Sequence, residues 1–330
     1  PGSKWHKSLS KQFPNSLISF GWTEDGKKAF VSVRSSTNPG DFYLLNTEKK
    51  SINYIGSSNQ SLDLELLSES KLFMFTARDG KKLQGIYSHP KDSQGNVPLI
   101  VIPHGGPKGP ADVPFYDPWV QVLNSFGYAT LKVNFRSSGG YGDLLEDAGD
   151  KAWGTAVIDD ITDGVNWVLN NKQVNADKIC VIGASFGGYA TMMSLIREPD
   201  LYQCGVPMMG VYDLSIMFTR DRADASRGKA RYMEDYRKNV IGHGDDAHMQ
   251  VHSPLNNADK VKDPVFFIHG AEDKRVPIIH MERMQSALSS LNKPYETLVF
   301  DDEGHGWRQE ENKVEFYQKL KNFLSKYLDT

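Results

Sequence analysis

The sequence predicts an α/β fold on a mostly parallel sheet, preceded by a small antiparallel β segment. From about residue 98 onward, short apolar segments typical of buried strands alternate with segments of helical periodicity. Strands that alternate with helices form parallel sheets covered on both faces. With 330 residues the chain also exceeds the size of a single hydrophobic core. We therefore expect a β-rich segment at residues 1–71 and a larger domain at 72–330.

The N-terminal segment has the pattern of a four-stranded meander. Short strand-like runs separated by turns occupy residues 16–23, 28–35, 41–46 and 51–56. Four antiparallel strands in about 40 residues match one blade of a β-propeller. Because propellers close with roughly four to eight blades, one blade cannot form a ring. A leftover blade and a fragment both remain open.

The larger domain begins with a hairpin and continues as alternating strands and helices. The hairpin turns at Asp79-Gly80, a pair suited to a two-residue turn. Buried-type strands follow at 98–105, 129–136, 178–185, 204–210, 264–270 and 295–302, and helices at 159–170, 189–197, 279–291 and 312–328. Residues 212–253 are polar and carry no strand signal, so we expect helices over the carboxyl edge of the sheet, where ligands bind in such folds.

Composition excludes two classes of function. The net charge is -3 and the basic residues are scattered, which lacks the basic stripe of a nucleic-acid binder. No apolar run approaches the roughly 20 residues needed to cross a bilayer, so no membrane partner is expected.

Cysteine usage bears on the compartment. Cys180 and Cys204 both lie in strand-like apolar stretches and are interpreted as core thiols, with a disulfide between them as the alternative. Two cysteines cannot build a disulfide framework, which favours a cytoplasmic location. The start at Pro1 has no initiator Met and no apolar targeting segment, and it leaves a removed signal peptide open.

A nucleophile motif follows the strand at 178–182. Gly183-Ala184-Ser185-Phe186-Gly187 matches G-x-S-x-G and precedes a helical segment, the strand-turn-helix context that this motif requires. Small residues are needed two positions before and after the serine because the turn is crowded, and glycine occupies both. The motif predicts an α/β-hydrolase fold with Ser185 as nucleophile.

A serine hydroxyl needs a general base and an acid that orients it. In this fold the acid follows a later strand and the histidine the next one. Asp273 follows the strand at 264–270, and His305, flanked by glycines, follows the strand at 295–302. The competing acids are Glu272, Asp301 and Asp302, and the competing bases are His104 and His269.

The oxyanion of a tetrahedral intermediate needs preorganised N–H donors. The glycine-rich loop His104-Gly105-Gly106-Pro107 follows the strand at 98–103. We expect Gly105 or Gly106 to provide one donor and the Phe186 N–H the other.

Several motifs together resemble the catalytic domain of the prolyl oligopeptidase family of serine peptidases, in its acylaminoacyl peptidase and dipeptidyl aminopeptidase branch. The resemblance covers about residue 72 to the end, and its motifs lie at 104–107, 134–142, 153–154 with 159–160, 183–190, 269–276 and 302–306. It implies that Ser185, Asp273 and His305 form the triad. One departure is the N-terminal region, because members carry a long propeller that screens the active site.

Other site hypotheses are weaker. His243, His248 and His252 lack the glutamate or H-E-x-x-H pattern of a catalytic zinc site, so no metal and no cofactor is expected. Tyr212, Met217, Phe218 and Trp307 follow strand ends and are candidates for a substrate pocket.

The function expected from these features is cleavage of small carboxylic esters through an acyl-enzyme on Ser185. With about one blade the chain lacks the usual means of gripping a peptide, so remote binding energy for amide cleavage is expected to be missing. The alternative is a serine peptidase acting on short acyl-peptides, and a further one is a non-catalytic binding protein. Unpaired strand edges in the blade are expected to be capped by the main domain or paired with another subunit, and a homodimer is the preferred expectation.

Overall fold

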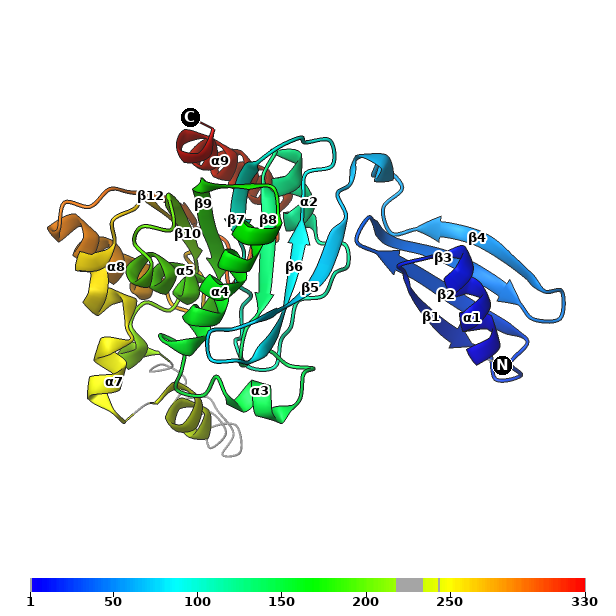
Figure 1. Cartoon of the computed structure of the whole chain (residues 1–330), viewed down its shortest axis with the longest axis horizontal. Coiled ribbons are helices and arrows are strands. Elements are labelled where there is room, and N and C mark those ends of the chain that lie inside the picture. The colour runs from blue at the N-terminus through cyan, green and yellow to red at the C-terminus, as the bar shows by residue number, and fades with distance from the viewer. Residues whose placement is uncertain (1, 218–233, 243, 330) are drawn as a thin grey trace. The chain divides into compact units, whose positions relative to one another are not determined.

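The computed structural model describes residues 2–217, 234–242 and 244–329 of the chain. The chain divides into two compact units. The smaller comprises 1–72, 86–93 and 113–128, and the larger comprises 73–85, 94–112 and 129–330. The expected fold class is confirmed: a mostly parallel eight-stranded sheet with helices, and a separate antiparallel sheet of four strands (Figure 1).

The four-stranded sheet is a simple meander with the order β1-β2-β3-β4. Its strands are β1 (Leu17–Trp22), β2 (Lys28–Ser35), β3 (Asn38–Asn46) and β4 (Ser51–Ser57). A helix that the sequence did not predict, α1 (Gly2–Gln12), precedes them. Trp5, Leu9 and Phe13 recur every four residues on one side of this segment, and they pack with sheet residues such as Val31 and Leu45. The small sheet therefore has a hydrophobic core of its own.

The large sheet has the strand order β12-β11-β10-β9-β7-β8-β6-β5. Its strands are β5 (Ser70–Thr76), β6 (Lys82–Ser88), β7 (Val97–Val101), β8 (Ala129–Asn134), β9 (Val174–Ala184), β10 (Cys204–Met208), β11 (Val265–Gly270) and β12 (Tyr295–Phe300). The neighbouring pairs from β12 to β8 are all parallel.

The strand order of this sheet reverses near its centre. β7 pairs with β8 on one side and with β9 on the other, so the strand order reverses between β7 and β9. Loops that leave such a point diverge, and open α/β sheets bind ligands there, outside the carboxyl ends of the strands. Ser185 follows β9 directly, and the loop of Gly105 follows β7.

Helices cover both faces of the sheet. A side chain at Gly205 would meet Leu195 of α5 (Phe186–Arg197), and Gly205 pairs with Val265. The next residue, Phe266, packs against Phe323 of α9 (Glu310–Leu328). Because successive strand residues face opposite sides, α5 and α9 lie on opposite faces.

The remaining helical elements connect these strands. They are η1 (Leu64–Leu66), α2 (Pro118–Ser125), α3 (Asp143–Asp147), α4 (Ala156–Asn171), η2 (Leu214–Ile216), η3 (Arg237–Ile241), α7 (Asp246–Val251), η4 (Pro254–Lys260) and α8 (Ile279–Ser290). No helix in the described ranges is long and apolar enough to cross a membrane.

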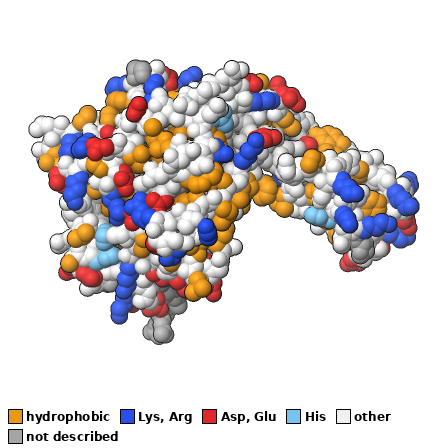
Figure 2. Space-filling view, in the orientation of Figure 1, with side chains coloured by type: hydrophobic (Ala, Val, Ile, Leu, Met, Phe, Trp, Pro, Cys, Tyr) orange, Lys and Arg blue, Asp and Glu red, His pale blue; other side chains and the backbone are white. Residues whose placement is uncertain are grey.

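On the face shown in Figure 2, positive and negative side chains are interspersed.

The two cysteines correct one expectation. Cys180 and Cys204 lie opposite one another on the parallel strands β9 and β10, with a Cα–Cα distance of 4.8 Å, and they form a disulfide. The expectation of core thiols is therefore wrong and its alternative holds. The pairing depends on the register between two strands, which neither strand's own sequence specifies.

Candidate active site

The turn between β9 and α5 holds Ser185 in an unusual backbone conformation. Its φ and ψ are 61° and -121°, a region that side-chain-bearing residues rarely adopt. The Ser185 N–H donates to the Met208 carbonyl at 3.0 Å, and the Tyr189 N–H donates to the Ser185 carbonyl. A Cβ at Gly183 would lie 2.3 Å from the Gly187 carbonyl oxygen. The crowding expected from the motif is thus present in the turn.

His305 and Asp273 come together from the loops after β12 and β11. The His305 Nδ1–H donates to Asp273 Oδ2 at 2.6 Å. The Asp273 side chain is fully buried, whereas that of His305 is 18% exposed. A buried carboxylate bonded to Nδ1 holds the imidazole in the tautomer whose Nε2 is free to accept a proton.

The Asp273 carboxylate is bound on both oxygens. Its Oδ1 accepts the backbone N–H groups of Arg275 at 2.8 Å and Val276 at 2.9 Å. Burial raises the pKa of Asp273, but the hydrogen bonds from His305 and from these backbone groups outweigh it, and the net shift of the pKa is downward. The carboxylate is therefore charged at neutral pH.

The acid and histidine loops are packed backbone against backbone. A Cβ at Gly270 would lie 2.3 Å from the Glu303 carbonyl oxygen and 2.4 Å from that of Gly304. The Glu272 N–H donates to the Glu303 carbonyl at 3.0 Å. The buried Glu303 side chain accepts the N–H groups of Arg308 and Gln309. These contacts fix the loop that carries His305 against the one that carries Asp273.

The glycine-rich loop lies directly beside the nucleophile. A Cβ at Gly105 would be 3.3 Å from the Ala184 carbonyl oxygen and 3.5 Å from the Cβ of Ser185. Gly106 has a φ of 126°, which favours glycine. Phe186 is buried at the start of α5. The structure thus brings the expected donor loop to Ser185, and the oxyanion role of Gly105, Gly106 and Phe186 stays a prediction.

The competing acids and bases are placed differently. Glu272 and Asp301 are exposed, and exposed Asp302 accepts hydrogen bonds from Gln309 and Asn312. His269 is completely buried, and its Nε2–H donates to the Val276 carbonyl at 2.9 Å. Of the acids, Asp273 is the one that the structure bonds to His305.

The four residues expected to line a pocket do not share one environment. Tyr212 is completely buried and packs edge-on against Phe267. Met217 is half-buried at the end of η2. Trp307 is half-buried and packs against Phe300 and Phe316. Phe218 lies outside the described residues, and the pocket assignment stays a prediction.

Sequence reasoning named two residues beside the site without assigning them a supporting role. His269 was considered as a rival base, yet its Nε2 lies 3.8 Å from Asp273 Oδ2, beside the carboxylate that binds His305. Phe135 stacks on the His104 ring with centroids 4.2 Å apart. Their signal is position: His269 lies near the end of β11, which leads into the Asp273 loop, and Phe135 directly follows β8.

Comparison with known proteins identifies the lineage. The model of the prolyl oligopeptidase family matches residues 115–330. The chain belongs to this family. It is 31% identical to dipeptidyl peptidase family member 6 of Caenorhabditis elegans over 90% of the chain and 43% of that protein. It is 29% identical to dipeptidyl aminopeptidase BIII of Pseudoxanthomonas mexicana, over 93% of the chain and 45% of the relative.

Solved structures of prolyl oligopeptidase relatives share the fold. An acylaminoacyl peptidase in complex with Z-Gly-Gly-Phe-chloromethyl ketone superposes with a TM-score of 0.77 at 26% identity, over 95% of this chain and 50% of that one. The Pyrococcus horikoshii acylaminoacyl peptidase gives 0.80 at 25% identity over the same shares. The chain thus spans about half the length of the proteins it matches.

These relationships overturn the expected preference for small esters. The family is one of peptidases, and the relatives that match along most of this chain carry the names of peptidases. The ester expectation rested on the number of blades in the given sequence, and that number does not determine whether a serine nucleophile cleaves an ester or an amide. The chain is a member of a serine hydrolase family whose matched proteins are peptidases.

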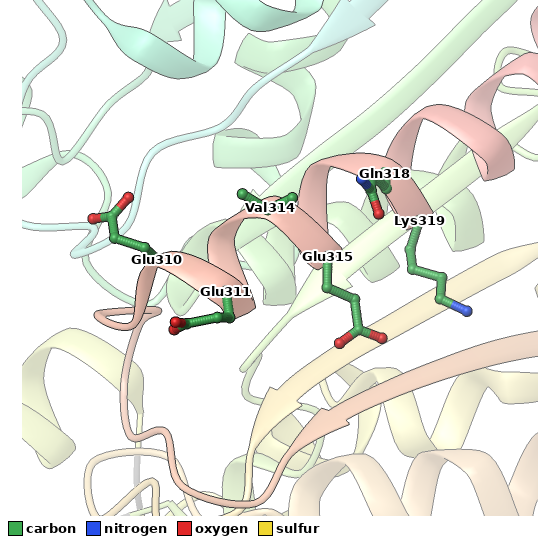
Figure 3. Close-up of a pocket in the computed structure, with 6 residues that line it drawn as sticks. All are labelled: Glu310, Glu311, Val314, Glu315, Gln318 and Lys319. Carbon is green, nitrogen blue, oxygen red and sulfur yellow. The ribbon is translucent and has the colours of Figure 1, made fainter.

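Two surface hollows of the larger unit have linings that do not include the candidate catalytic residues. One follows α9 and is lined by Glu310, Glu311, Val314, Glu315, Gln318 and Lys319 (Figure 3). The other, of about 580 Å³, is lined by polar residues that include Asp213, Ser253 and Lys260. Neither is lined by Ser185, Asp273 or His305.

Proposed function

We propose that the protein is a serine peptidase that releases dipeptides from the free amino terminus of short peptides. The observation that carries the proposal is the buried Asp273–His305 hydrogen bond of 2.6 Å, at the same sheet edge as the strained Ser185. Membership of the prolyl oligopeptidase family supports peptides as the substrate class.

In this proposal His305 takes the proton of the Ser185 hydroxyl while the oxygen attacks the peptide carbonyl. Asp273 stays ionised and holds the imidazole while it carries the positive charge. His305 then gives the proton to the departing amine, and the acyl group remains on Ser185. A water molecule, deprotonated by the same histidine, attacks the ester, releases the acid and restores Ser185.

The charge that develops on the carbonyl oxygen needs two N–H donors. The Phe186 N–H begins α5, where the helix dipole favours negative charge. The glycine-rich loop packed against Ser185 supplies the other donor. Such preorganised donors act in the transition state and are worth about 3 to 4 kcal/mol each.

The extent of the matches favours dipeptide release over removal of acylated residues. The dipeptidyl relatives align with 90% and 93% of the chain. The acylamino-acid-releasing enzyme 1 of rice aligns with 76% at 26% identity. Acylaminoacyl peptidase activity is the second candidate, favoured by the structural matches, which cover 95% of the chain.

A substrate panel distinguishes the two. We expect kcat/KM for dipeptidyl p-nitroanilides with a free amino group to exceed that for N-acetyl-aminoacyl p-nitroanilides by at least about tenfold, a difference of about 1.4 kcal/mol in transition-state binding. The reverse order would establish the second candidate, and cleavage of neither class would remove both.

Ser185→Ala is the control for this panel. The substitution should lower the rate by about 10⁶-fold without loss of structure, because nothing else in the site can form the acyl-enzyme. Circular dichroism monitors the fold, and labelling by a fluorophosphonate should disappear with the activity. A variant that keeps a tenth of the wild-type rate would contradict the assignment of the nucleophile.

A further inference from the structure

His269 is a buried histidine whose ring makes one hydrogen bond of fixed direction. It lies in β11, four residues before Asp273 in the chain, and it is completely buried. Its Nε2 lies 2.9 Å from the carbonyl oxygen of Val276. A carbonyl oxygen only accepts, so Nε2 carries a proton.

The other nitrogen of the ring indicates that His269 is neutral. Its Nδ1 is buried, and no residue in the described part of the chain is hydrogen-bonded to it. A second proton there would leave a buried, charged N–H group without an acceptor, which is costly. Desolvation is the largest influence on the pKa of His269 and lowers it, which favours the same neutral form.

Val276 connects this ring to the acid of the triad. Its carbonyl accepts the bond from His269, while its N–H donates to Asp273 Oδ1 at 2.9 Å. The bond from His269 thus closes the acid loop at its base. The Arg275 N–H donates to the same carboxylate oxygen at 2.8 Å. Both backbone donors that hold Oδ1 therefore belong to the end of the loop that His269 anchors.

Asp273 Oδ2 is left for His305. It lies 2.6 Å from His305 Nδ1 but 3.8 Å from His269 Nε2, which is beyond hydrogen-bond distance. His269 therefore does not compete with His305 for this oxygen. Because the His269 ring is neutral, it also does not neutralise the charge that the carboxylate presents to His305.

We propose that His269 is a positioning residue for the acid of the triad, and that it acts through its Nε2–H bond to the Val276 carbonyl. This bond anchors the residue whose N–H orients the Asp273 carboxylate, and the carboxylate in turn orients His305. The inference rests on the proposed acyl transfer at Ser185. It requires that Nε2, and not Nδ1, carries the effect.

Two amide variants separate the two ring nitrogens. The side-chain nitrogen of His269→Gln occupies roughly the place of Nε2, whereas that of His269→Asn occupies roughly the place of Nδ1. We expect His269→Ala and His269→Asn to lower kcat by about 10- to 100-fold, with KM changed by less than about threefold, because a displaced catalytic group costs about 10²-fold. His269→Gln should stay within about fivefold of the wild type, since its amide N–H can still donate to the Val276 oxygen.

Proton NMR measures the orientation of the acid without any substrate. The His305 Nδ1–H, in its short bond to Asp273, should give a strongly downfield resonance, and Asp273→Asn should abolish that resonance and so assign it. We expect His269→Gln to retain the resonance. In His269→Ala and His269→Asn it should move upfield or broaden, because the bond becomes longer and more open to water.

A core variant of the same unit controls for a general loss of stability. Leu324 is completely buried in α9, so Leu324→Ala leaves a cavity there, and it does not alter residues 269–276. This variant should have a lower free energy of unfolding, while its kcat and the downfield resonance stay as in the wild type. A merely structural role of His269 would likewise lower stability without moving the resonance.

Several outcomes overturn the inference. They are a His269→Ala enzyme with unchanged kcat, a loss confined to KM, equal behaviour of His269→Gln and His269→Asn, and a fall in kcat without a change in the resonance. If neither His269→Ala nor His269→Asn folds, His269→Gln decides alone. It must then retain both the resonance and kcat, and the loss of either overturns the inference.

A wild type that cleaves no peptide of the panel would refute the proposed function but not this inference. The rate at which a fluorophosphonate labels Ser185 then replaces kcat, because His305 must accept the serine proton in that reaction too. The same order is required, with His269→Gln close to the wild type and with His269→Asn and His269→Ala slow. The NMR experiment needs no substrate and is read in the same way.

Discussion

At the scale of single residues, the site depends on how buried groups are compensated. The Asp273 side chain is fully buried, and an isolated carboxylate at that depth would be strongly destabilised in its charged form. Two backbone N–H groups and the His305 Nδ1–H replace the lost water. The same three donors also fix the direction of the Asp273 carboxylate. The hydrogen bonds that stabilise its charge therefore also hold the His305 ring in place.

Replacement of this acceptor by an amide tests that feature. Asp273→Asn should lower kcat by about 10⁴-fold, because an amide nitrogen can donate to the ring and select the wrong tautomer of His305. Steady-state kinetics on the best peptide substrate measure the effect. Glu272→Gln is the matched control, since it neutralises the neighbouring acid, which is exposed. An Asp273→Asn enzyme within tenfold of the wild type would show that another group orients His305.

At the scale of elements, the strand-to-helix turn works because backbones approach one another without side chains between them. A Cβ at Gly187 would lie 2.3 Å from the carbonyl oxygen of Pro103, the residue before the donor loop. The start of α5 is therefore packed directly against the end of the segment that leads to Gly105. Neither backbone can yield without moving Ser185 or the glycine-rich loop that follows Pro103.

Gly187→Ala should therefore reduce activity and stability together. We expect a loss in kcat of about 10²-fold, since displacements of about 1 Å have that effect, and a destabilisation of about 1 to 3 kcal/mol from overpacking. The control is Gly21→Ala in β1, where the nearest atom to the added Cβ is 3.9 Å away. Urea unfolding and kcat are measured for both variants, and the prediction fails if Gly187→Ala changes neither quantity.

How far the sequence predicts the fold depends on whether the signal is local. The strands of the large sheet are recognisable from their apolar runs, and chain order then places the loops of Ser185, Asp273 and His305 at one edge. Helix α1 was missed because it is largely polar and its apolar side is evident only where Leu9 meets the small sheet. The Cys180–Cys204 disulfide was misjudged because strand register is a tertiary property.

The candidate site, like the fold, has features that local sequence predicts and features that only the tertiary structure determines. The identities of the triad candidates follow from motifs and their order, whereas the partners of His104 lie in a loop some 30 residues further along the chain, at Phe135 and Ser138. Substrate preference was beyond the motifs, since attack by a serine is common to esters and amides. The mistaken expectation of an esterase came from an absence, and family membership corrects it.

At the scale of the whole molecule, stability depends on buried groups that titrate differently once the chain unfolds. His280, in α8 of the larger unit, is 2% exposed. Its Nδ1 accepts the backbone N–H groups of Tyr212 and Asp213, each at 3.3 Å. A proton on Nδ1 would therefore face two N–H donors.

The folded state thus favours neutral His280. Desolvation lowers the pKa of His280 to about 4, with opposing effects from Asp213 and Asp273, which raise it, and additional lowering by His269 and Arg283. In the unfolded chain the histidine has its ordinary pKa of about 6.5. As the pH falls from 6.5 towards 4, the unfolded state therefore binds a proton that the folded state does not bind.

Acidification should consequently destabilise the protein through this residue. The linkage relation gives a loss of about 2 kcal/mol between pH 7.5 and pH 5 and of roughly 3 kcal/mol at pH 4, and it approaches a limit of about 3.4 kcal/mol below pH 3. His280→Asn removes the titration while its side-chain oxygen can still accept the Tyr212 and Asp213 N–H groups. We therefore expect the free energy of unfolding of His280→Asn, measured in urea, to change less between pH 7.5 and pH 5 than that of the wild type, by about 2 kcal/mol.

His6→Asn, at an exposed histidine in α1, is the control, and its free energy of unfolding should change with pH as in the wild type. Equal pH dependence in the wild type and His280→Asn would show that the acid sensitivity of the fold has its source in other groups.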